Sequence, residues 1–440
     1  MLILKSGTKG FQERLGKIVR RMELAWAEGV EQTVQEIIQA VKARGDEALI
    51  EYTHRFDHCP LTKEELLVSK KEIAQAYQAV DDKTLGALQL AAQRIKEFHL
   101  QQRYQASSWI KQEEQGVWAG QLIQPLKRVG VYVPGGKAAY PSSVLMNIIP
   151  AKVAEVEEII LCTPPSPDHQ NKINPYVMVA ADLAQANRIF KLGGAQAIAA
   201  MAFGTETVPK VDKVVGPGNI YVAAAKKMVY GEVGIDLIAG PSEIVILADQ
   251  TADPDLIAAN LLAQAEHDEQ ALVVLITDAE DLAQVVVARI EAQKARLGRQ
   301  DIIYHSLNRW GTVFLTDNLE QALDLSNQIG PEHLLLMVKE PWAMLAGVKN
   351  AGAVFLGNYA PVALGDYLAG PNHVLPTGNT ARFFSPLGVY DFIKRTNFVY
   401  APSQTSRNLI EKAAILARLE GLNAHAHSLE MGNKTNKGEG

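Results

Sequence analysis

Short apolar runs alternate with longer helical patterns along the chain from residue 128 onward. Runs that predict strands buried on both faces lie at 129–133, 158–162, 188–192 and 213–215. Helical patterns lie between them at 144–156, 177–186 and 195–203. This alternation predicts crossover connections, and therefore a parallel sheet with helices on both faces.

A second set of the same kind follows. Its predicted strands lie at 243–249, 272–277, 333–338 and 353–357, with helices such as 281–297 between them. The first 100 or so residues are mainly helical, as in 30–44, where Val34, Ile37 and Val41 recur at helical spacing. We therefore expect an α/β fold with two incomplete Rossmann-like parallel-sheet domains and smaller helical segments at both ends.

The expected boundaries make one of the two domains discontinuous. An N-terminal helical segment covers 1–28, and one α/β domain combines 29–131 with 244–380. Residues 132–243 form the inserted α/β domain, and 381–440 form a C-terminal segment with one helix at 403–420. The tail at 431–440 is polar and rich in glycine, so we expect it to be disordered.

Composition and charge narrow the class of partner. The 440 residues carry 43 basic and 49 acidic side chains, a formal charge of −6, which gives no electrostatic reason to expect nucleic acid or an anionic membrane. No secretory signal and no run of roughly 20 apolar residues is present, so we expect a cytoplasmic protein with a small-molecule substrate. The two cysteines, Cys59 and Cys162, exclude a disulfide framework.

Three glycine-containing loops follow predicted strands of the first set. They lie at 132–136, 193–196 and 216–219, and no GxGxxG motif accompanies them. Each loop alone is more often a tight turn than a binding site. Three at the carboxyl ends of one parallel sheet favour a ligand of nucleotide size, because glycine lets a ligand approach the backbone.

The stretch 235–270 predicts a strand followed by a helix that begins at Asp253 and Pro254. Gln264 and His267 stand three residues apart near the end of this helix, so both side chains project from one face and can converge on one ligand. Spacing alone still favours ordinary surface or core residues over metal ligands.

Two further clusters combine carboxylates with histidines. Glu332 and His333 follow a Gly-Pro turn, and histidine with its ordinary pKa of about 6.5 accepts a proton at neutral pH. Without other information, a capped turn with a partly buried histidine is the favoured interpretation. Asp366 lies in a Gly-Asp-Tyr segment that by itself indicates a turn, and Glu420 and His425 flank a glycine that ends a helix.

Taken together, these blocks closely resemble the histidinol dehydrogenase family. The resemblance covers about 129–425 and includes AGPSE at 239–243, QAEH at 264–267, GPEH at 330–333, ALGDYLAGPNHVLPT at 363–377 and EGLNAH at 420–425. Three positions depart from the usual family pattern, namely Lys137, Asn260 and Asn379.

The resemblance implies a role for each candidate residue. His333 is implied as the base for the alcohol, and Glu332 as the group that activates water. Implied Zn²⁺ ligands, one ion per subunit, are Gln264, His267, Asp366 and His425. Implied NAD contacts are Tyr132, Gln196 and Asn219. Implied substrate contacts are Ser242, Gln264, His267, Glu332, His333, Asp366, Glu420 and His425. His373 and His427 fall outside the implied ligand set, and His373 is expected to be structural.

The resemblance also implies a reaction and an assembly. Family members oxidise L-histidinol to L-histidine through L-histidinaldehyde, with two NAD molecules, in the last step of histidine biosynthesis. They are homodimers with shared active sites, so Glu420 and His425 would act in the site of the partner subunit. The inserted domain at 132–243 would bind NAD, and the discontinuous domain would carry most metal and catalytic residues.

Two other function classes stay open at this point. A zinc hydrolase could use Gln264, His267 and Asp366 as ligands and Glu332 as base, without NAD. A binding protein could have kept the fold for sensing a nucleotide or an amino acid, but none of the implied site residues is missing.

Overall fold

The computed structural model describes residues 1–21, 29–113, 116–135, 139–402 and 405–434. Two compact units make up the chain. The main unit comprises Met1–Gln101 and Leu126–Phe392, and the ribbon unit comprises Gln102–Pro125 and Ile393–Gly440. No helix within the described ranges is both long and apolar enough to cross a membrane.

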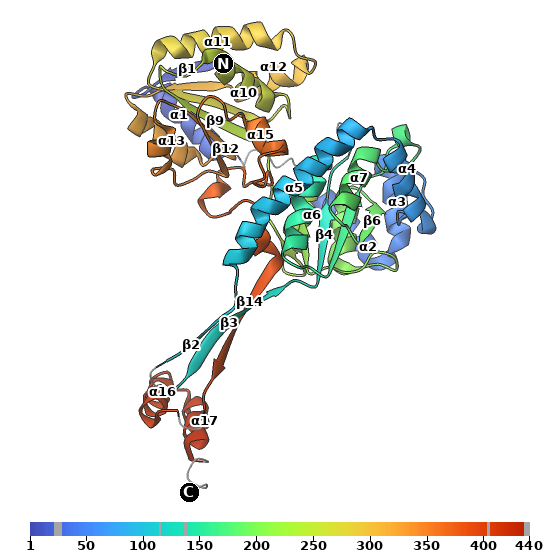
Figure 1. Ribbon diagram of the computed structural model, residues 1–440, viewed down its shortest axis with the longest axis vertical. Helices are drawn as coiled ribbons and strands as arrows, with labels where there is room; N and C mark the ends of the chain where they lie inside the picture. Colours follow the sequence, from blue (N-terminus) through green and yellow to red (C-terminus); the bar gives the residue numbers. More distant parts are fainter. Residues whose placement is uncertain (22–28, 114–115, 136–138, 403–404, 435–440) are drawn as a thin grey trace. The chain divides into compact units, whose positions relative to one another are not determined.

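A six-stranded parallel sheet forms one half of the main unit. Its strand order is β1 (Leu2–Lys5), β11 (Thr312–Leu315), β10 (Leu272–Thr277), β9 (Glu243–Ala248), β12 (His333–Met337) and β13 (Ala353–Leu356). Ile244 and Ile246 of β9 face one hydrophobic core, and Val245 and Leu247 face another. Every residue of β9 is buried, because helices cover both faces of the sheet (Figure 1).

Five helices supply most of these two cores. On one face lie α10 (Pro254–Ala265), α11 (Glu280–Lys294) and α12 (Gln300–Arg309), and on the other lie α1 (Lys9–Val19) and α13 (Leu319–Ile329). Two short helices, α14 (Pro341–Leu345) and α15 (Val362–Tyr367), follow β12 and β13.

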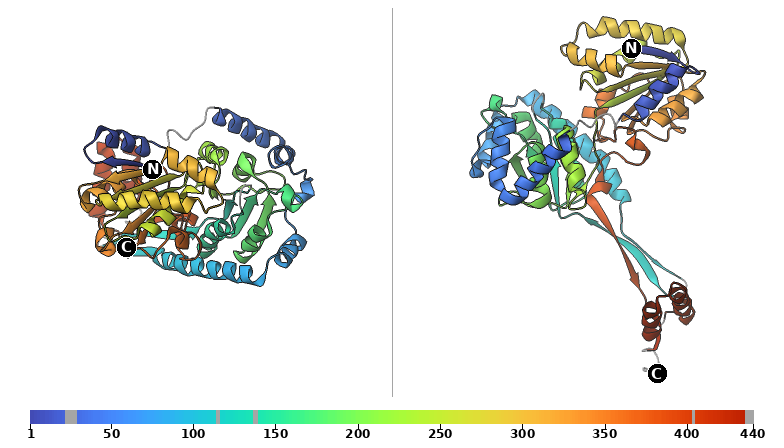
Figure 2. Two further views of the ribbon diagram at one scale, coloured as in Figure 1. Left: turned by 90° about the horizontal axis from the view of Figure 1, so that it is seen from above. Right: turned by 180° about the vertical axis from the view of Figure 1, so that it is seen from behind.

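A five-stranded parallel sheet forms the other half of the main unit. Its order is β6 (Arg188–Lys191), β5 (Glu158–Thr163), β4 (Arg128–Tyr132), β7 (Lys213–Val215) and β8 (Gly234–Ile235). One core joins the sheet to α2 (Val30–Arg44), α3 (Asp46–Asp57), α8 (Gly194–Phe203) and α9 (Ile220–Val229). Also in this half are α6 (Pro141–Val153) and α7 (Pro175–Leu183), with α4 (Lys70–Gln78) against α7 (Figure 2).

The ribbon unit is an antiparallel sheet with two helices. Its strand order is β14 (Ile393–Tyr400), β3 (Trp118–Pro125) and β2 (Trp109–Gln112). The helices α16 (Arg407–Leu419) and α17 (Asn423–Lys434) pack against each other. The long helix α5 (Asp82–Gln105) precedes β2 in the chain.

The predicted fold class is confirmed, and the eight strands predicted from apolar runs are present with ends that differ by at most one residue. The predicted grouping of segments differs from the structure in two ways. Residues 30–57 pack on the five-stranded sheet, because the apolar faces of α2 and α3 join its core. Residues 102–125 pair with the C-terminal segment through β3 and β14. In addition, three strands of the parallel sheets were not predicted, namely β1 and β11 of the six-stranded sheet and β8 of the five-stranded sheet.

The C-terminal helices also differ from the prediction. The predicted helix at 403–420 begins at Arg407, and residues 403 and 404 lie outside the described part of the chain. The expected disordered tail at 431–440 is wrong for its first four residues, because α17 continues to Lys434. Residues 435–440 also lie outside the described part.

Candidate active site

Glu332 and His333 lie at the amino end of β12, beside the amino end of the neighbouring strand β9 in the six-stranded sheet. Helix α13 ends at Gly330, whose left-handed φ of 52° turns the chain so that Pro331 and Glu332 lead directly into β12. His333 is the first residue of β12 and pairs in register with Ile244 of β9. Both site side chains are buried, with exposed fractions of 7% for Glu332 and 5% for His333.

The backbone of Glu243 holds both side chains. His333 Nδ1 donates to the carbonyl oxygen of Glu243 at 3.0 Å, and the Glu243 N–H donates to Oε2 of Glu332 at 2.8 Å. Since a carbonyl oxygen can only accept, the hydrogen bond places a proton on Nδ1 and leaves Nε2 as the basic nitrogen. Nε2 is buried and makes no hydrogen bond to any described residue.

Buried charges hold Glu243 in turn. Its carboxylate forms an ion pair with Arg21, in which the Arg21 Nη2 lies 2.6 Å from Oε2 and Nε contacts Oε1. Its Oε2 accepts from the Glu332 N–H at 3.2 Å, and its Oε1 accepts from the Gly378 N–H at 2.7 Å. Arg21 and Glu243 are both buried, so water screens the attraction between them only weakly. The ion pair therefore helps to hold the start of β9 against the start of β12.

Asp366 approaches His333 from α15. Its Oδ1 lies 3.7 Å from His333 Nε2. Burial by itself lowers the pKa of His333, but the charges of Glu332 and Asp366 outweigh it and raise that pKa to about 9. Burial raises the pKa of Glu332 to about 7, against the opposing charge of His333. The pKa of Asp366 is raised by burial, but contact with His333 and the charges of His373 and His267 produce a net lowering.

His267 is close enough to Asp366 and His333 for their charges to act on it. It lies in the turn after α10 rather than in the helix, and its N–H donates to the carbonyl oxygen of Gln264 at 3.3 Å. The helix ends at Ala265, two residues before His267, which was expected within it. The His267 side chain is exposed in the single chain, yet neighbouring protein atoms lower its pKa. This favours the neutral imidazole that ligates metals.

The donor set within the main unit is incomplete for a metal. The described residues hold no group of three or more His, Cys, Asp or Glu side chains that could bind an ion. Of the implied ligands in the main unit, only His267 and Asp366 are of these residue types. The third, Gln264, is an amide in α10 and is 4% exposed. The remaining candidate residues lie in the ribbon unit, where Glu420 caps α16 and His425 is an exposed residue of α17.

His373 supports Asp366 rather than joining it as a free donor. Its Nδ1 donates to the backbone carbonyl oxygen of Asp366 at 2.9 Å, and its Nε2 lies 3.2 Å from the hydroxyl of Ser143 in α6. Burial lowers the pKa of His373, which keeps the ring neutral. This agrees with the structural role predicted for it.

Two of the three departures from the family pattern have clear contacts. Asn260 accepts from the Val362 N–H at 3.2 Å and so ties α10 to the start of α15, which carries Asp366. Asn379 adopts a left-handed φ of 68°, and its Oδ1 accepts from Arg382 Nε at 2.9 Å. Lys137 lies outside the described residues.

The predicted nucleotide loops lie at the carboxyl ends of strands in the five-stranded sheet. Tyr132 ends β4, and its hydroxyl accepts from the Gly194 N–H at 3.1 Å. Gln196 in the first turn of α8 is 1% exposed, and neither atom of its amide bonds to a described residue. Asn219 caps α9 by accepting from the Tyr221 and Val222 N–H groups. Ser242, half-buried, precedes β9 in the other half.

Sequence reasoning missed Glu243 and Arg21. A glutamate that begins an otherwise apolar buried strand is a usable signal, because a buried carboxylate needs a partner. The identity of that partner was not readable, since Arg21 lies 222 residues away in the chain.

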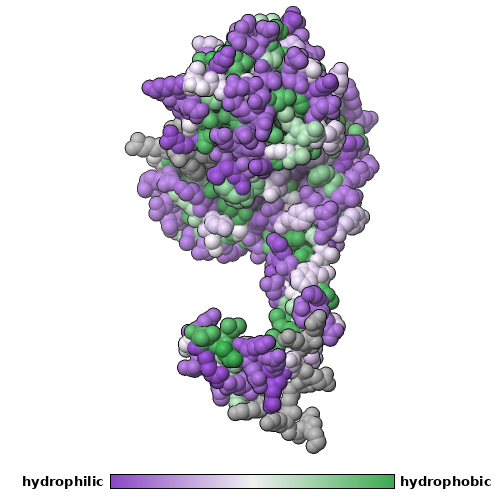
Figure 3. All heavy atoms as spheres, turned by 90° about the vertical axis from the view of Figure 1, so that its left-hand side faces the viewer, coloured by the Kyte–Doolittle hydropathy of each residue, from purple (hydrophilic) through white to green (hydrophobic). Residues whose placement is uncertain are grey.

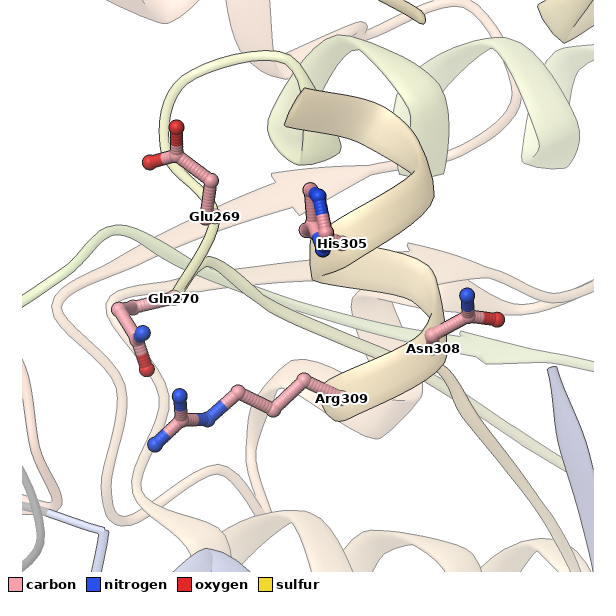
Figure 4. A pocket seen from close by; sticks show the side chains of 5 residues that line it. All are labelled: Glu269, Gln270, His305, Asn308 and Arg309. Atoms are coloured by element: carbon pink, nitrogen blue, oxygen red, sulfur yellow. The ribbon is translucent and has the colours of Figure 1, made fainter. Parts of the chain in front are cut away.

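A separate hollow lies between α12 and the loop after α10 (Figure 4). Its lining side chains are Glu269, Gln270, His305, Asn308 and Arg309, none of which is a predicted site residue.

Comparisons with known proteins identify the family of this chain. The sequence model of the family described as histidinol dehydrogenase matches residues 20–432. The histidinol dehydrogenase of Syntrophotalea carbinolica is 51% identical over 98% of this chain and 99% of its own length. That of Aquifex aeolicus is 49% identical over 95% and 96%. The crystal structure of histidinol dehydrogenase from Elizabethkingia anophelis, 36% identical, superposes with a TM-score of 0.93 over 99% of this chain and 98% of that one. The chain therefore belongs to the histidinol dehydrogenase family of oxidoreductases.

Proposed function

We propose that this chain oxidises L-histidinol to L-histidine through L-histidinaldehyde, with two NAD molecules as successive oxidants. The observation that carries the proposal is the hydrogen bond from His333 Nδ1 to the Glu243 carbonyl oxygen, which directs the basic Nε2 toward Asp366. The family membership adds support, because the relatives bear the name of this activity.

In the first half-reaction, His333 Nε2 takes the proton of the substrate hydroxyl. Loss of that proton raises electron density on the carbinol carbon and makes departure of its hydride easier. The raised pKa of His333 gives its imidazole a strong affinity for the proton that it removes. The Asp366 carboxylate, 3.7 Å from Nε2, stabilises the positive ring that results.

In the second half-reaction, Glu332 takes a proton from the water that adds to the aldehyde carbonyl. The proton taken from water passes to the former carbonyl oxygen, and the resulting hydrate keeps a hydrogen on the same carbon that can leave as a hydride in the second oxidation. The pKa of Glu332, about 7, suits this role, since about half of its carboxyl groups are ionised at neutral pH. The Glu243 N–H fixes Oε2, so the other oxygen of the carboxyl group is left for water.

A zinc ion fits the donors that this chain offers. Gln264, His267 and Asp366 of one subunit and His425 of the partner chain would supply two nitrogens and two oxygens, a set that Zn²⁺ accepts. The lowered pKa values of His267 and Asp366 support this assignment, because ligands bind in their deprotonated forms. Zn²⁺, when bound, supplies a template for the imidazole and amino nitrogens of the substrate.

NAD would bind at the carboxyl ends of the strands in the five-stranded sheet. The amide of buried Gln196 bonds to no described residue and is left for a ligand. Gly194 and Gly216 lie beside Tyr132 at the same edge of the sheet. NAD, when bound there, would supply the acceptor for the hydride that leaves the substrate. Its use also supports a cytoplasmic location, where the cofactor is abundant.

A homodimer would complete the site. Apolar side chains of the ribbon unit are exposed in the single chain, including Leu416 at 62% and Leu419 at 77% (Figure 3). Exposed apolar surface of this kind marks an interface. In a symmetric dimer, Glu420 would hold substrate and His425 would ligate zinc in the partner's site.

The proposal is tested by incubating purified enzyme with L-histidinol and NAD. Two NADH per L-histidine formed are expected, measured by absorbance and by amino-acid analysis. One NADH per substrate with accumulated aldehyde, or no NADH at all, would contradict it. Hydrolysis without NADH would instead favour the zinc hydrolase.

A further inference from the structure

The five-stranded sheet has the strand order of a dinucleotide-binding half. Numbered along the chain from β4, its strands run third, second, first, fourth and fifth. In sheets of this order, an acidic residue near the end of the second strand commonly binds the adenosine ribose. The second strand here is β5, and Pro164, Pro165, Ser166 and Pro167 follow it, so no carboxylate occupies that place.

An acidic side chain from a different element lies there instead. Asp57 is the last residue of α3. A Cβ atom added to Gly193 would stand 3.1 Å from each carboxylate oxygen of Asp57 and 2.7 Å from Cβ of Pro164. Asp57, Pro164 and Gly193 therefore meet at the carboxyl ends of β5 and β6, beside the first turn of α8.

One oxygen of the Asp57 carboxylate has no hydrogen-bond partner among the described residues. This atom, Oδ2, is buried, and burial raises the pKa of the carboxyl to about 7. The amide of Gln196, one turn further into α8, is equally unbonded. Unsatisfied buried polar groups cost folding free energy, and a ligand with hydroxyl donors would offset that cost.

We propose that Asp57 binds the 2′- and 3′-hydroxyls of the adenosine ribose of NAD and thereby excludes NADP. Two ribose hydroxyls donate to two carboxylate oxygens, whereas a 2′-phosphate would place like charges together without screening. The proposal rests on the NAD site proposed above. It adds a specificity residue that lies outside the three glycine loops.

Asp57→Asn tests the proposal against a matched control. Affinities for NAD, NADP, ADP-ribose and its 2′-phosphate are measured by calorimetry on the full-length enzyme. Loss of a charged hydrogen bond predicts about 10-fold to 100-fold weaker NAD and ADP-ribose binding, with NADP binding unchanged or stronger. Asp168→Asn, the next acidic residue after β5 and exposed, is expected to leave every affinity unchanged.

Three outcomes would overturn the inference. One is an unchanged ratio of NAD to NADP affinity in Asp57→Asn, and another is a shifted ratio in Asp168→Asn. The third is equal affinity of the wild-type enzyme for NAD and NADP. It would show that no residue excludes the 2′-phosphate. Failure of the proposed function is distinguishable, because wild-type enzyme would then neither bind nor reduce NAD.

Discussion

His333 Nδ1, at the start of β12, donates a hydrogen bond at 3.0 Å to the backbone carbonyl oxygen of Glu243, at the start of the adjacent parallel strand β9. A backbone acceptor on a buried strand cannot rotate away, as a side-chain acceptor could. The orientation and tautomer of the imidazole are thus built into the sheet itself. Any change that shifts β9 relative to β12 should then alter proton transfer as well as stability.

Replacing Arg21 with Met should destabilise the protein strongly. The substitution leaves the buried carboxylate of Glu243 without its cation, which typically costs about 3–5 kcal/mol in the free energy of unfolding. Urea denaturation followed by circular dichroism measures the loss. Arg20→Met is the control, because Arg20 is exposed and bonds only within α1 and its cap. Adding Glu243→Gln to Arg21→Met should recover part of the stability, and no recovery would argue against the ion pair.

His333→Asn should lose alcohol oxidation by a factor of about 10² to 10⁴, the usual contribution of a general base. In the wild type, the rate should increase with pH up to about 9, because only the deprotonated imidazole accepts a proton. Steady-state NADH formation from histidinol across pH measures both effects. The variant should lack this increase, whereas His305→Asn, at an exposed position of α12, should keep it. A variant with the wild-type pH profile would remove His333 as base.

Glu332→Gln should slow oxidation of supplied histidinaldehyde while leaving the fold intact. Glutamine keeps an oxygen that accepts the Glu243 N–H, but it cannot take a proton from water. In the wild type, this half-reaction should weaken as pH falls below about 7, because the carboxyl group then binds a proton. Single-turnover NADH formation from the aldehyde checks both statements. Unimpaired aldehyde oxidation in the variant would contradict water activation by Glu332.

Local sequence pattern was enough to predict eight of the eleven strands in the two parallel sheets. All six residues of β9 and all six of β10 are buried. Strands that are buried on both faces have nearly continuous apolar sequences, which can be recognised without the structure. The same reasoning could not find β3 and β14. Most of their residues are partly or fully exposed, and their pairing joins residues about 270 positions apart, as Gly120 opposite Phe398.

Predictability of the site follows the same division. Glu332 and His333 are adjacent in the chain and stand out as a motif. The contacts of Glu243 with Arg21 and Gly378, and those of Asp57 with Gly193, are made between distant segments and leave no local pattern. Only the fold reveals them, because packing decides which distant residues meet.

Removing metal should abolish histidinol binding while NAD still binds. Zn²⁺ is expected at one ion per subunit, and its loss removes the template that holds the substrate nitrogens. Elemental analysis before and after chelation and calorimetry with each ligand measure the effect. Asp366→Asn should lower the zinc content, and Asp168→Asn should not, since that residue is exposed on a different sheet's loop. Full histidinol affinity in metal-free enzyme would contradict the template role.

Mixing two inactive variants should restore activity if the ribbon unit serves the partner's site. His333→Asn and His425→Asn each disable both sites of their own homodimer. A mixed dimer holds one site with His333 from one chain and His425 from the other, so random exchange should yield up to about a quarter of the wild-type activity. Exchange is verified with subunits carrying different affinity tags, and mixing His333→Asn with Glu332→Gln is the control, because both residues come from one chain under either arrangement. A shared site predicts no recovery from His425→Asn mixed with Glu420→Gln, because both residues come from the same ribbon unit. Absence of recovery between the His333 and His425 variants, despite proven exchange, would mean that each chain completes its own site.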